Sequence, residues 1–276
     1  MSDNAFGAPL STDVDTTIAH EARVYDYWLG GKDNYPADRA LGDAIGEHVP
    51  AIKTMARANR AFLGRAVRHL VAEAGITQFL DIGTGIPTAG NTHEVAQQLD
   101  PNARVVYVDK DPIVLAHARA LMDSTPQGRT RFIHADLHDP QSILDHPDIA
   151  DTLDLTEPVA IMLVAIMMYF ADSDRPQDII ATLLDAVPSG SYVVITHPTA
   201  DFAPEAMAGV KAAAEASGIS FNPRSNAETG DLFTGTTLIE PGLVPVAAWR
   251  PELVDRPVAV AEAESAWYWA GIGRKP

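Results

Sequence analysis

The chain has 276 residues, of which 37 are acidic and 20 basic, giving a formal net charge of −17. This acid excess argues against nucleic acid or an anionic membrane surface as the main partner, because both call for basic patches. Hydrophobic residues make up 46% and cysteine is absent, so a buried core is possible and disulfides, thiolate nucleophiles and zinc–thiolate sites are excluded.

The first part of the chain predicts a helical region. Residues 1–17 are polar and lack the apolar stretch of a secretory signal, so we expect a flexible arm. Residues 18–75 predict a helical cover or lid, interrupted at Gly30-Gly31, Pro36 and Pro50. Its last helix carries an apolar stripe formed by Met55, Ala58, Phe62, Ala66 and Leu70.

Residues 76–276 predict one domain in which strands and helices alternate. The expected strands are short apolar runs without clear alternation, typical of a parallel sheet covered on both faces: 78–82, 104–108, 130–135, 159–166 and 192–196. The expected helices cover 92–99, 112–122, 140–152, 176–186 and 204–217. Two late strands, at 243–249 and 266–272, predict an antiparallel hairpin at the sheet edge.

The expected fold is therefore α/β and Rossmann-like, with a mostly parallel seven-stranded sheet and an N-terminal helical cover. The longest apolar run, 159–171, is shorter than the roughly 20 residues that span a bilayer. We expect a cytoplasmic protein without a membrane partner.

The carboxyl ends of the predicted strands carry acidic and glycine residues. In open α/β sheets, ligands bind at these ends. Gly83 and Gly85 allow a sharp turn and close approach of the backbone to a ligand. The following helix is expected to direct free N–H groups at the same place. Asp109, 24 residues after Gly85, is expected to accept hydrogen bonds from ribose hydroxyls, and Asp136 from an adenine amino group.

The glycine-containing loop after the first predicted strand differs from the glycine-rich loop of dinucleotide-binding proteins. The third small residue of the dinucleotide pattern is replaced by Thr88, and Asp81 opens the loop with a negative charge. A cofactor without phosphate and with a positive centre suits this loop better. S-adenosylmethionine has that character, and Asp81 or nearby carbonyls are expected to receive its ammonium group.

The sequence resembles the actinobacterial S-adenosylmethionine methyltransferase-like family, long catalogued as a domain of unknown function. The resemblance runs from about residue 20 to the C-terminus, and its most specific motif is the first of these stretches: 22–38, 57–60, 78–88, 93–96, 105–112, 188–192 and 240–244. It implies a class I methyltransferase fold, S-adenosylmethionine as cofactor and S-adenosylhomocysteine as product. Members usually carry a histidine after the fourth strand, where this chain has Met168 before Tyr169.

The motif at 22–38 predicts a lid over the cofactor. Its aromatic residues would enclose the sulfonium, since aromatic faces attract cations. One of Arg57, Asn59 and Arg60 is expected to bind the methionine carboxylate, unless these residues only form a solvated helix face. The full set of expected cofactor residues is Tyr25, Lys32, Asn34, Arg60, Asp81, Gly83, Thr84, Gly85, Asp109, Lys110, Asp136 and Leu137.

For catalysis, the topology offers His197 and Tyr169 as candidate bases at the ends of the fifth and fourth strands. Three histidines at 134, 138 and 146 have no spacing typical of metal ligands, so no metal site is expected. The leading hypothesis is methyl transfer to a small molecule. The alternatives are a non-catalytic sensor of S-adenosylmethionine, suggested by Met168, and a nicotinamide-dependent oxidoreductase.

Overall fold

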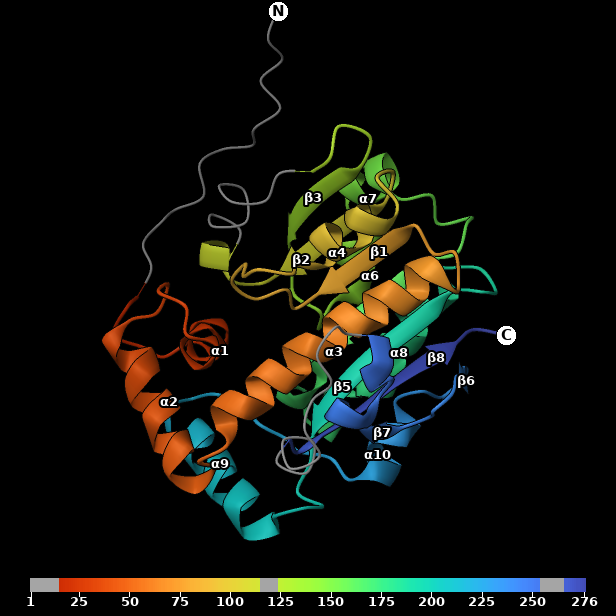
Figure 1. The fold of residues 1–276 in the computed structure, drawn as a ribbon. Coiled ribbons are helices and arrows are strands. Elements are labelled where there is room, and N and C mark those ends of the chain that lie inside the picture. Colours follow the sequence, from red (N-terminus) through yellow and green to blue (C-terminus); the bar gives the residue numbers. More distant parts are fainter. Residues whose placement is uncertain (1–14, 115–123, 254–265) are drawn as a thin grey trace, which may run out of the picture.

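The computed structural model describes residues 15–114, 124–253 and 266–276 (Figure 1). Most of the arm expected at 1–17, and most of the helix expected at 112–122, lie outside the described residues. No helix in the described part is both long and apolar enough to cross a membrane.

The centre of the molecule is an eight-stranded sheet in the order β3-β2-β1-β4-β5-β8-β6, with β7 paired to β8. β1 to β5 are mutually parallel and β8 runs antiparallel to β5, as the sequence predicts for a mostly parallel sheet. The strands are β1 Gln78–Ile82, β2 Arg104–Asp109, β3 Arg129–His134, β4 Ala160–Val164, β5 Tyr192–Pro198, β6 Thr237–Leu238, β7 Val244–Pro245 and β8 Tyr268–Arg274.

The inner strands separate two hydrophobic cores. In β2, Val105 belongs to the core on one face and Val106 to the core on the other, as expected when successive side chains point to opposite faces. Ala160 and Ile161 of β4 divide in the same way. Each inner strand therefore needs apolar residues at consecutive positions, which is why its sequence shows no alternation.

Helices cover both faces of this sheet (Figure 1). The first core contains residues of α1 to α4 and α9, and the second contains residues of α6, α7 and α8. Figure 1 shows α1, α2 and α9 grouped beyond the carboxyl ends of the central strands. The helices are α1 Glu21–Leu29, α2 Pro36–His48, α3 Ile52–Ala72, α4 Thr92–Leu99, α6 Pro140–Leu144, α7 Pro147–Thr152, α8 Pro176–Asp185, α9 Pro204–Ala216 and α10 Asn226–Asp231.

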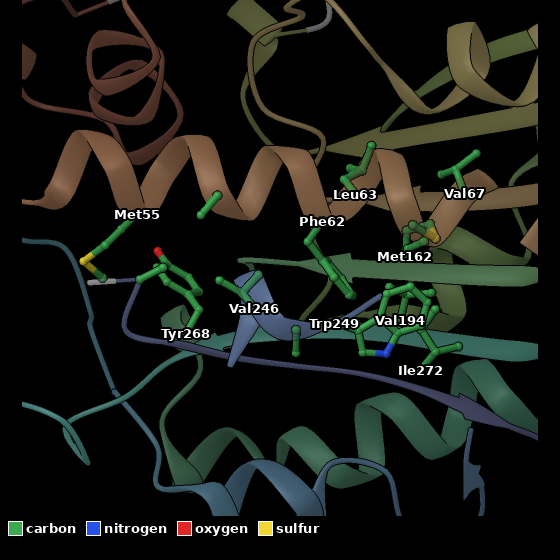
Figure 2. Packing of buried hydrophobic residues seen from close by; sticks show 14 of the residues in the cluster. Met55, Phe62, Leu63, Val67, Met162, Val194, Val246, Trp249, Tyr268 and Ile272 are labelled. Atoms are coloured by element: carbon green, nitrogen blue, oxygen red, sulfur yellow. The ribbon is translucent and has the colours of Figure 1, made fainter. Parts of the chain in front are cut away.

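The long helix α3 packs directly on the sheet (Figure 2). Its Phe62 meets Trp249 edge to face, with ring centroids 5.3 Å apart. Arg65, which is fully buried, donates from Nε to the carbonyl oxygen of Trp249 at 2.7 Å and from Nη2 to that of Val246 at 2.6 Å. Apolar packing and two buried hydrogen bonds thus fix α3 against the segment that follows β7.

Four details differ from the sequence-based expectation. The sheet has eight strands and not the expected seven, because β6 was not predicted. β3 is an edge strand whose Arg129, Arg131 and His134 are exposed, so it is not buried on both faces. The helix expected at 140–152 is two short helices, because Pro147 starts a new one and disfavours helix at the residue before it. The strand expected at 243–249 contains only Val244–Pro245 and continues as the 3₁₀ helix Val246–Ala248.

Candidate functional site

A cavity of about 490 Å³ lies where β1, β2 and β4 end, covered by α1 and α3. Its size falls in the range of about 300–1,000 Å³ that is typical of small-molecule sites. The residues expected from the sequence that line it are Tyr25, Arg60, Asp81, Gly83, Thr84, Gly85, Asp109, Lys110, Asp136, Leu137 and Tyr169.

The turn after β1 brings the backbone to the cavity. Gly83 and Gly85 have φ values of 75° and 66°, in the left-handed region that favours glycine. A Cβ atom on Gly83 would also lie 2.6 Å from the Ile166 side chain. Gly85 N–H donates to Asp109 Oδ2 at 2.9 Å, so the glycine turn and the end of β2 are directly linked.

Two carboxyl groups lie on the cavity wall, that of the buried Asp81 and that of the half-buried Asp109. Burial raises the pKa of Asp81 to about 6, although Thr92 Oγ1 donates to its Oδ2 at 2.6 Å. Burial also raises the pKa of Asp109, while hydrogen bonds from the N–H groups of Asp111 and Gly85 act in the opposite direction. A cation in the cavity would stabilise both carboxylates in their ionised form.

Buried polar atoms without a partner stand on the part of the wall formed by α3. Among the described residues, Asn59 Oδ1 and Arg60 Nε have no hydrogen-bond partner. Arg60 Nη2 donates to Asn91 Oδ1 at 2.7 Å, which holds the guanidinium beside the glycine turn. Unsatisfied buried polar groups cost about 1–3 kcal/mol each, so these two atoms are suited to a polar ligand.

The other end of the cavity is formed after β3. Asp136 Oδ1 is 2.7 Å from His138 Nδ1, and the His138 ring stacks on Phe170 at 4.3 Å. Partial burial opposes ionisation of Asp136, but its hydrogen bonds with His138 outweigh this effect and lower its pKa. Leu137 is buried beside them, so this end offers both an apolar surface and a carboxylate.

Several lining residues were not expected from the sequence. Glu21 Oε1 forms an ion pair with Lys110 Nζ at 2.9 Å, which joins α1 to the end of β2. Burial raises the pKa of Glu21, but His20 and Lys110 outweigh it and lower the value overall. Neither a strand end nor a glycine pattern marks these positions. The unexpected lining residues include His20, Glu21, His138 and Ser217–Ser220.

His197 does not line this cavity. Its side chain is fully buried, with Nδ1 2.9 Å from the carbonyl oxygen of Pro198 and Nε2 3.0 Å from Arg224 Nη1. Since the guanidinium can only donate, Nε2 accepts and Nδ1 carries the proton. Burial lowers the pKa of His197 to about 4. The ring is therefore neutral at pH 7.

Lys32 and Asn34 are also outside the cavity lining. Lys32 is exposed, and Asn34 is buried in the turn between α1 and α2. Asn34 Nδ2 donates to Asp26 Oδ2 at 2.8 Å and to the carbonyl oxygen of Gly31 at 3.1 Å. The polar residues of this motif thus stabilise the turn, while Tyr25 from the preceding helix reaches the cavity.

The start of α4 also differs from expectation, because it does not line the cavity. Glu94 Oε2 accepts from the N–H groups of Gly90 and Asn91, and the Tyr107 hydroxyl accepts from that of His93. These N–H groups are already satisfied inside the protein. The arrangement offers no helix N-terminus to a phosphate.

Comparisons with known proteins agree with this geometry. The chain matches the model of the S-adenosyl methyltransferase family over residues 8–276. A DUF574 family protein from Streptomyces avermitilis is 47% identical, with a TM-score of 0.90 over 95% of this chain and 99% of that one. A protein from Thermobifida fusca that has been proposed to be a methyltransferase is 42% identical. Its TM-score is 0.85 over 94% of this chain and 96% of that one.

More distant structures share the fold. Plantazolicin methyltransferase, solved in complex with S-adenosylhomocysteine, is 13% identical with a TM-score of 0.53 over 92% of this chain and 95% of that one. A search of curated protein sequences gives no significant match. Because the family model covers nearly the whole chain, the protein belongs to the S-adenosyl methyltransferase family, with the Rossmann-like class I fold and S-adenosylmethionine as its cofactor.

Proposed function

We propose that the chain binds S-adenosylmethionine in the cavity at the ends of β1 and β2 and methylates a small-molecule acceptor. The observation that carries this proposal is the distribution of polar groups along the cavity. A carboxylate at the end of β2 faces the glycine turn, and unsatisfied atoms of Asn59 and Arg60 stand at the wall beside it.

The residues present fit the parts of this cofactor. Asp109 suits the ribose hydroxyls, and Asp136 with Leu137 suits the adenine. Arg60 suits the methionine carboxylate because its Nε has no partner. The raised pKa of Asp81, caused first by burial, suits a site that receives a cation such as the ammonium group.

The bound cofactor would supply an activated methyl group on a sulfonium, whose sulfur would leave as a neutral thioether when the acceptor forms its bond to the methyl carbon. A hydroxyl acceptor would release its proton to the solvent. The protein's tasks are then to orient the acceptor and exclude water. Tyr169 lines the cavity, and burial raises its pKa well above the ordinary value, so its hydroxyl stays protonated and orients rather than removes a proton. His197 has its two ring nitrogens engaged elsewhere.

We assign residues 18–75 to the cover of this site and 76–276 to the catalytic domain. Glu21 and Tyr25 of α1 and Asn59 and Arg60 of α3 all line the cavity, which supports this division. No observation favours the sensor or the oxidoreductase. The cover and the glycine turn together suit an adenosine cofactor without phosphate.

Calorimetry with S-adenosylhomocysteine tests the site. We expect wild type to bind, and Asp109→Ala to bind at least about 30-fold more weakly, since about 2 kcal/mol is typical for hydrogen bonds to a charged group. Asp185→Ala, on the exposed side of α8, is the matched control and should bind as wild type does. Equal affinity of wild type and Asp109→Ala would contradict the proposed site.

A further inference from the structure

A second, smaller cavity lies against the cofactor cavity. It holds about 40 Å³ and is enclosed by α1, α2, α3, α9 and β8. Glu21, Tyr169 and Ile219 line both cavities, so we call these three residues the gate and the smaller cavity the apolar chamber. The chamber has no role in holding the cofactor as proposed above.

The walls of the chamber are almost wholly apolar. Three methionines contribute to them, and thioether groups make favourable contacts with aromatic rings and adapt to irregular shapes. Aromatic side chains complete the wall. The residues of both kinds are Met55, Met168, Met207, Trp28, Tyr169, Phe221 and Tyr268. Figure 2 shows Met55 and Tyr268 at the same end of α3.

Charge in the chamber excludes anions. Among its described lining residues there is no lysine, arginine or histidine, and the charged one is Glu21. Lys110, the ion-pair partner of Glu21, lines the cofactor cavity but not the chamber. An anionic group would therefore be desolvated beside a carboxylate without a compensating cation, which is strongly unfavourable.

Two tyrosines contribute to the walls of the chamber. Tyr169 lines both cavities and Tyr268 lines the chamber, and neither hydroxyl forms a hydrogen bond with a described residue. Burial raises the pKa of both phenols, so at neutral pH each hydroxyl can donate and accept. A ligand with one hydroxyl would satisfy them while its apolar part occupies the chamber.

We propose that the apolar chamber binds the methyl acceptor, and that this acceptor is an uncharged aromatic compound presenting a hydroxyl at the gate. This inference rests on the proposed function, because the gate faces the cofactor cavity. The volume of the chamber is smaller than that of an aromatic ring. The ring of the acceptor therefore enters only when the three flexible methionine side chains move aside.

The experiment uses the full chain saturated with S-adenosylhomocysteine. Two aromatic probes are titrated into it separately, and their binding is followed by NMR. p-Cresol is the uncharged probe, and p-hydroxybenzoate has the same ring and hydroxyl with a carboxylate. We expect p-cresol to bind at least about tenfold more tightly than p-hydroxybenzoate, a difference of about 1.4 kcal/mol.

Two alanines of α9 provide a matched pair of variants. Ala214 is buried and lines the chamber, whereas Ala212 on the same helix is exposed. Ala214→Phe should weaken p-cresol binding at least about tenfold by filling the chamber, and Ala212→Phe should leave it unchanged. Met207→Ala, which enlarges the chamber, should admit naphthol more tightly than wild type does, and tests the inference if Ala214→Phe does not fold.

The outcomes separate the two proposals. If S-adenosylhomocysteine does not bind wild type, the proposed function fails. If it binds but p-cresol does not, if p-hydroxybenzoate binds as tightly, or if filling and enlarging the chamber have no effect, the acceptor inference alone is overturned.

Discussion

Asp81 lies in the proposed cofactor site, and burial of its charge lowers the stability of the fold. It is buried in β1, and Thr92 and Arg60 only partly compensate the burial of its charge. The sequence marks Asp81 and Asp109 because each stands beside a turn at the end of an apolar strand. It does not mark the burial that alters their ionisation, because burial depends on segments distant in sequence, such as α3 and α4 beside Asp81.

We predict that Asp81→Asn stabilises the ligand-free protein and weakens binding of S-adenosylmethionine. The pKa of Asp81 rises from 3.8 to about 6 through burial, so its contribution to stability is greatest below pH 3.8 and is lost as pH rises through about 6. At pH 7 the variant should be more stable by an amount on the order of 2 kcal/mol.

Urea denaturation from pH 4 to pH 8 measures this difference. The advantage of Asp81→Asn should grow between about pH 4 and pH 6 and then level off. Asp185→Asn, at an exposed position, serves as control and should show little change. A variant less stable than wild type at pH 7 would refute the assignment.

The role of His197 could not be predicted from its position at the end of a strand. A histidine near the end of a buried strand can face the ligand or the interior, and the choice depends here on Arg224, which is 27 residues further along the chain. The segment around Arg224 has no hydrophobic periodicity that would place it beside β5. The contact could not be predicted from either residue alone.

We predict that His197 makes the fold sensitive to mild acid. Burial lowers its pKa from 6.5 to about 4, so its contribution to stability is present above pH 6.5 and is lost as pH falls towards 4. This loss amounts to about 3 kcal/mol. His197→Gln does not titrate, so the stability of wild type relative to this variant should fall between pH 6.5 and pH 4 in chemical denaturation. A constant difference would show that the ring titrates normally.

At the scale of elements, the sequence predicts the central strands and the helices between them well. The bounds of β1 and α4 agree with the expectation, because a short, mostly apolar run and a helical pattern each end at clear turn residues. β6 was missed, since a two-residue strand carries no periodic signal. Its pairing depends on β8 alone, which the local sequence does not reveal.

Arg224, which lies outside the loop after β4, forms three hydrogen bonds with it. Arg224 donates to the carbonyl oxygens of Met167 and Phe170 at 3.1 and 2.9 Å, and to Asp172 Oδ1 at 2.9 Å. Tyr169 lies inside this loop and reaches the cavity. The position of Tyr169 therefore depends on a residue that does not itself line the cavity.

Arg224→Met should destabilise the protein by about 2–4 kcal/mol, because it removes the donor from the carbonyl oxygen of Phe170 and from the buried Nε2 of His197. Arg175→Met is the matched control, since Arg175 is 79% exposed and pairs only with the exposed Asp178. It should change stability by less than about 0.5 kcal/mol. Thermal and urea unfolding measure both variants, and similar losses in the two would contradict the role given to Arg224.

At the scale of the whole molecule, the net charge of −17 argues against more classes of methyl acceptor than the fold does. A class I methyltransferase fold by itself is compatible with many acceptors, whereas the acid excess disfavours polyanions. The excess negative charges also repel one another in the folded protein, which lowers its stability.

We therefore predict that sodium chloride raises the melting temperature of the ligand-free protein. Raising the salt from about 0.02 M to 0.3 M shortens the Debye length and screens the repulsion. A gain of about 1 kcal/mol corresponds to about 2–4 °C for a domain of this size. Differential scanning calorimetry measures the shift, with sucrose of equal osmolality as control. A fall in melting temperature would mean that attractive ion pairs outweigh the general repulsion.

The position of β8 has a consequence for how the chain is made. β8 follows every other described element in sequence, yet it pairs with β5 along seven residues and also with β6 and β7. Until residues 268–274 leave the ribosome, β5 has an open edge that can pair with another nascent chain. A premature stop before β8 would therefore yield an aggregation-prone protein, even though every proposed cofactor contact precedes it in the sequence.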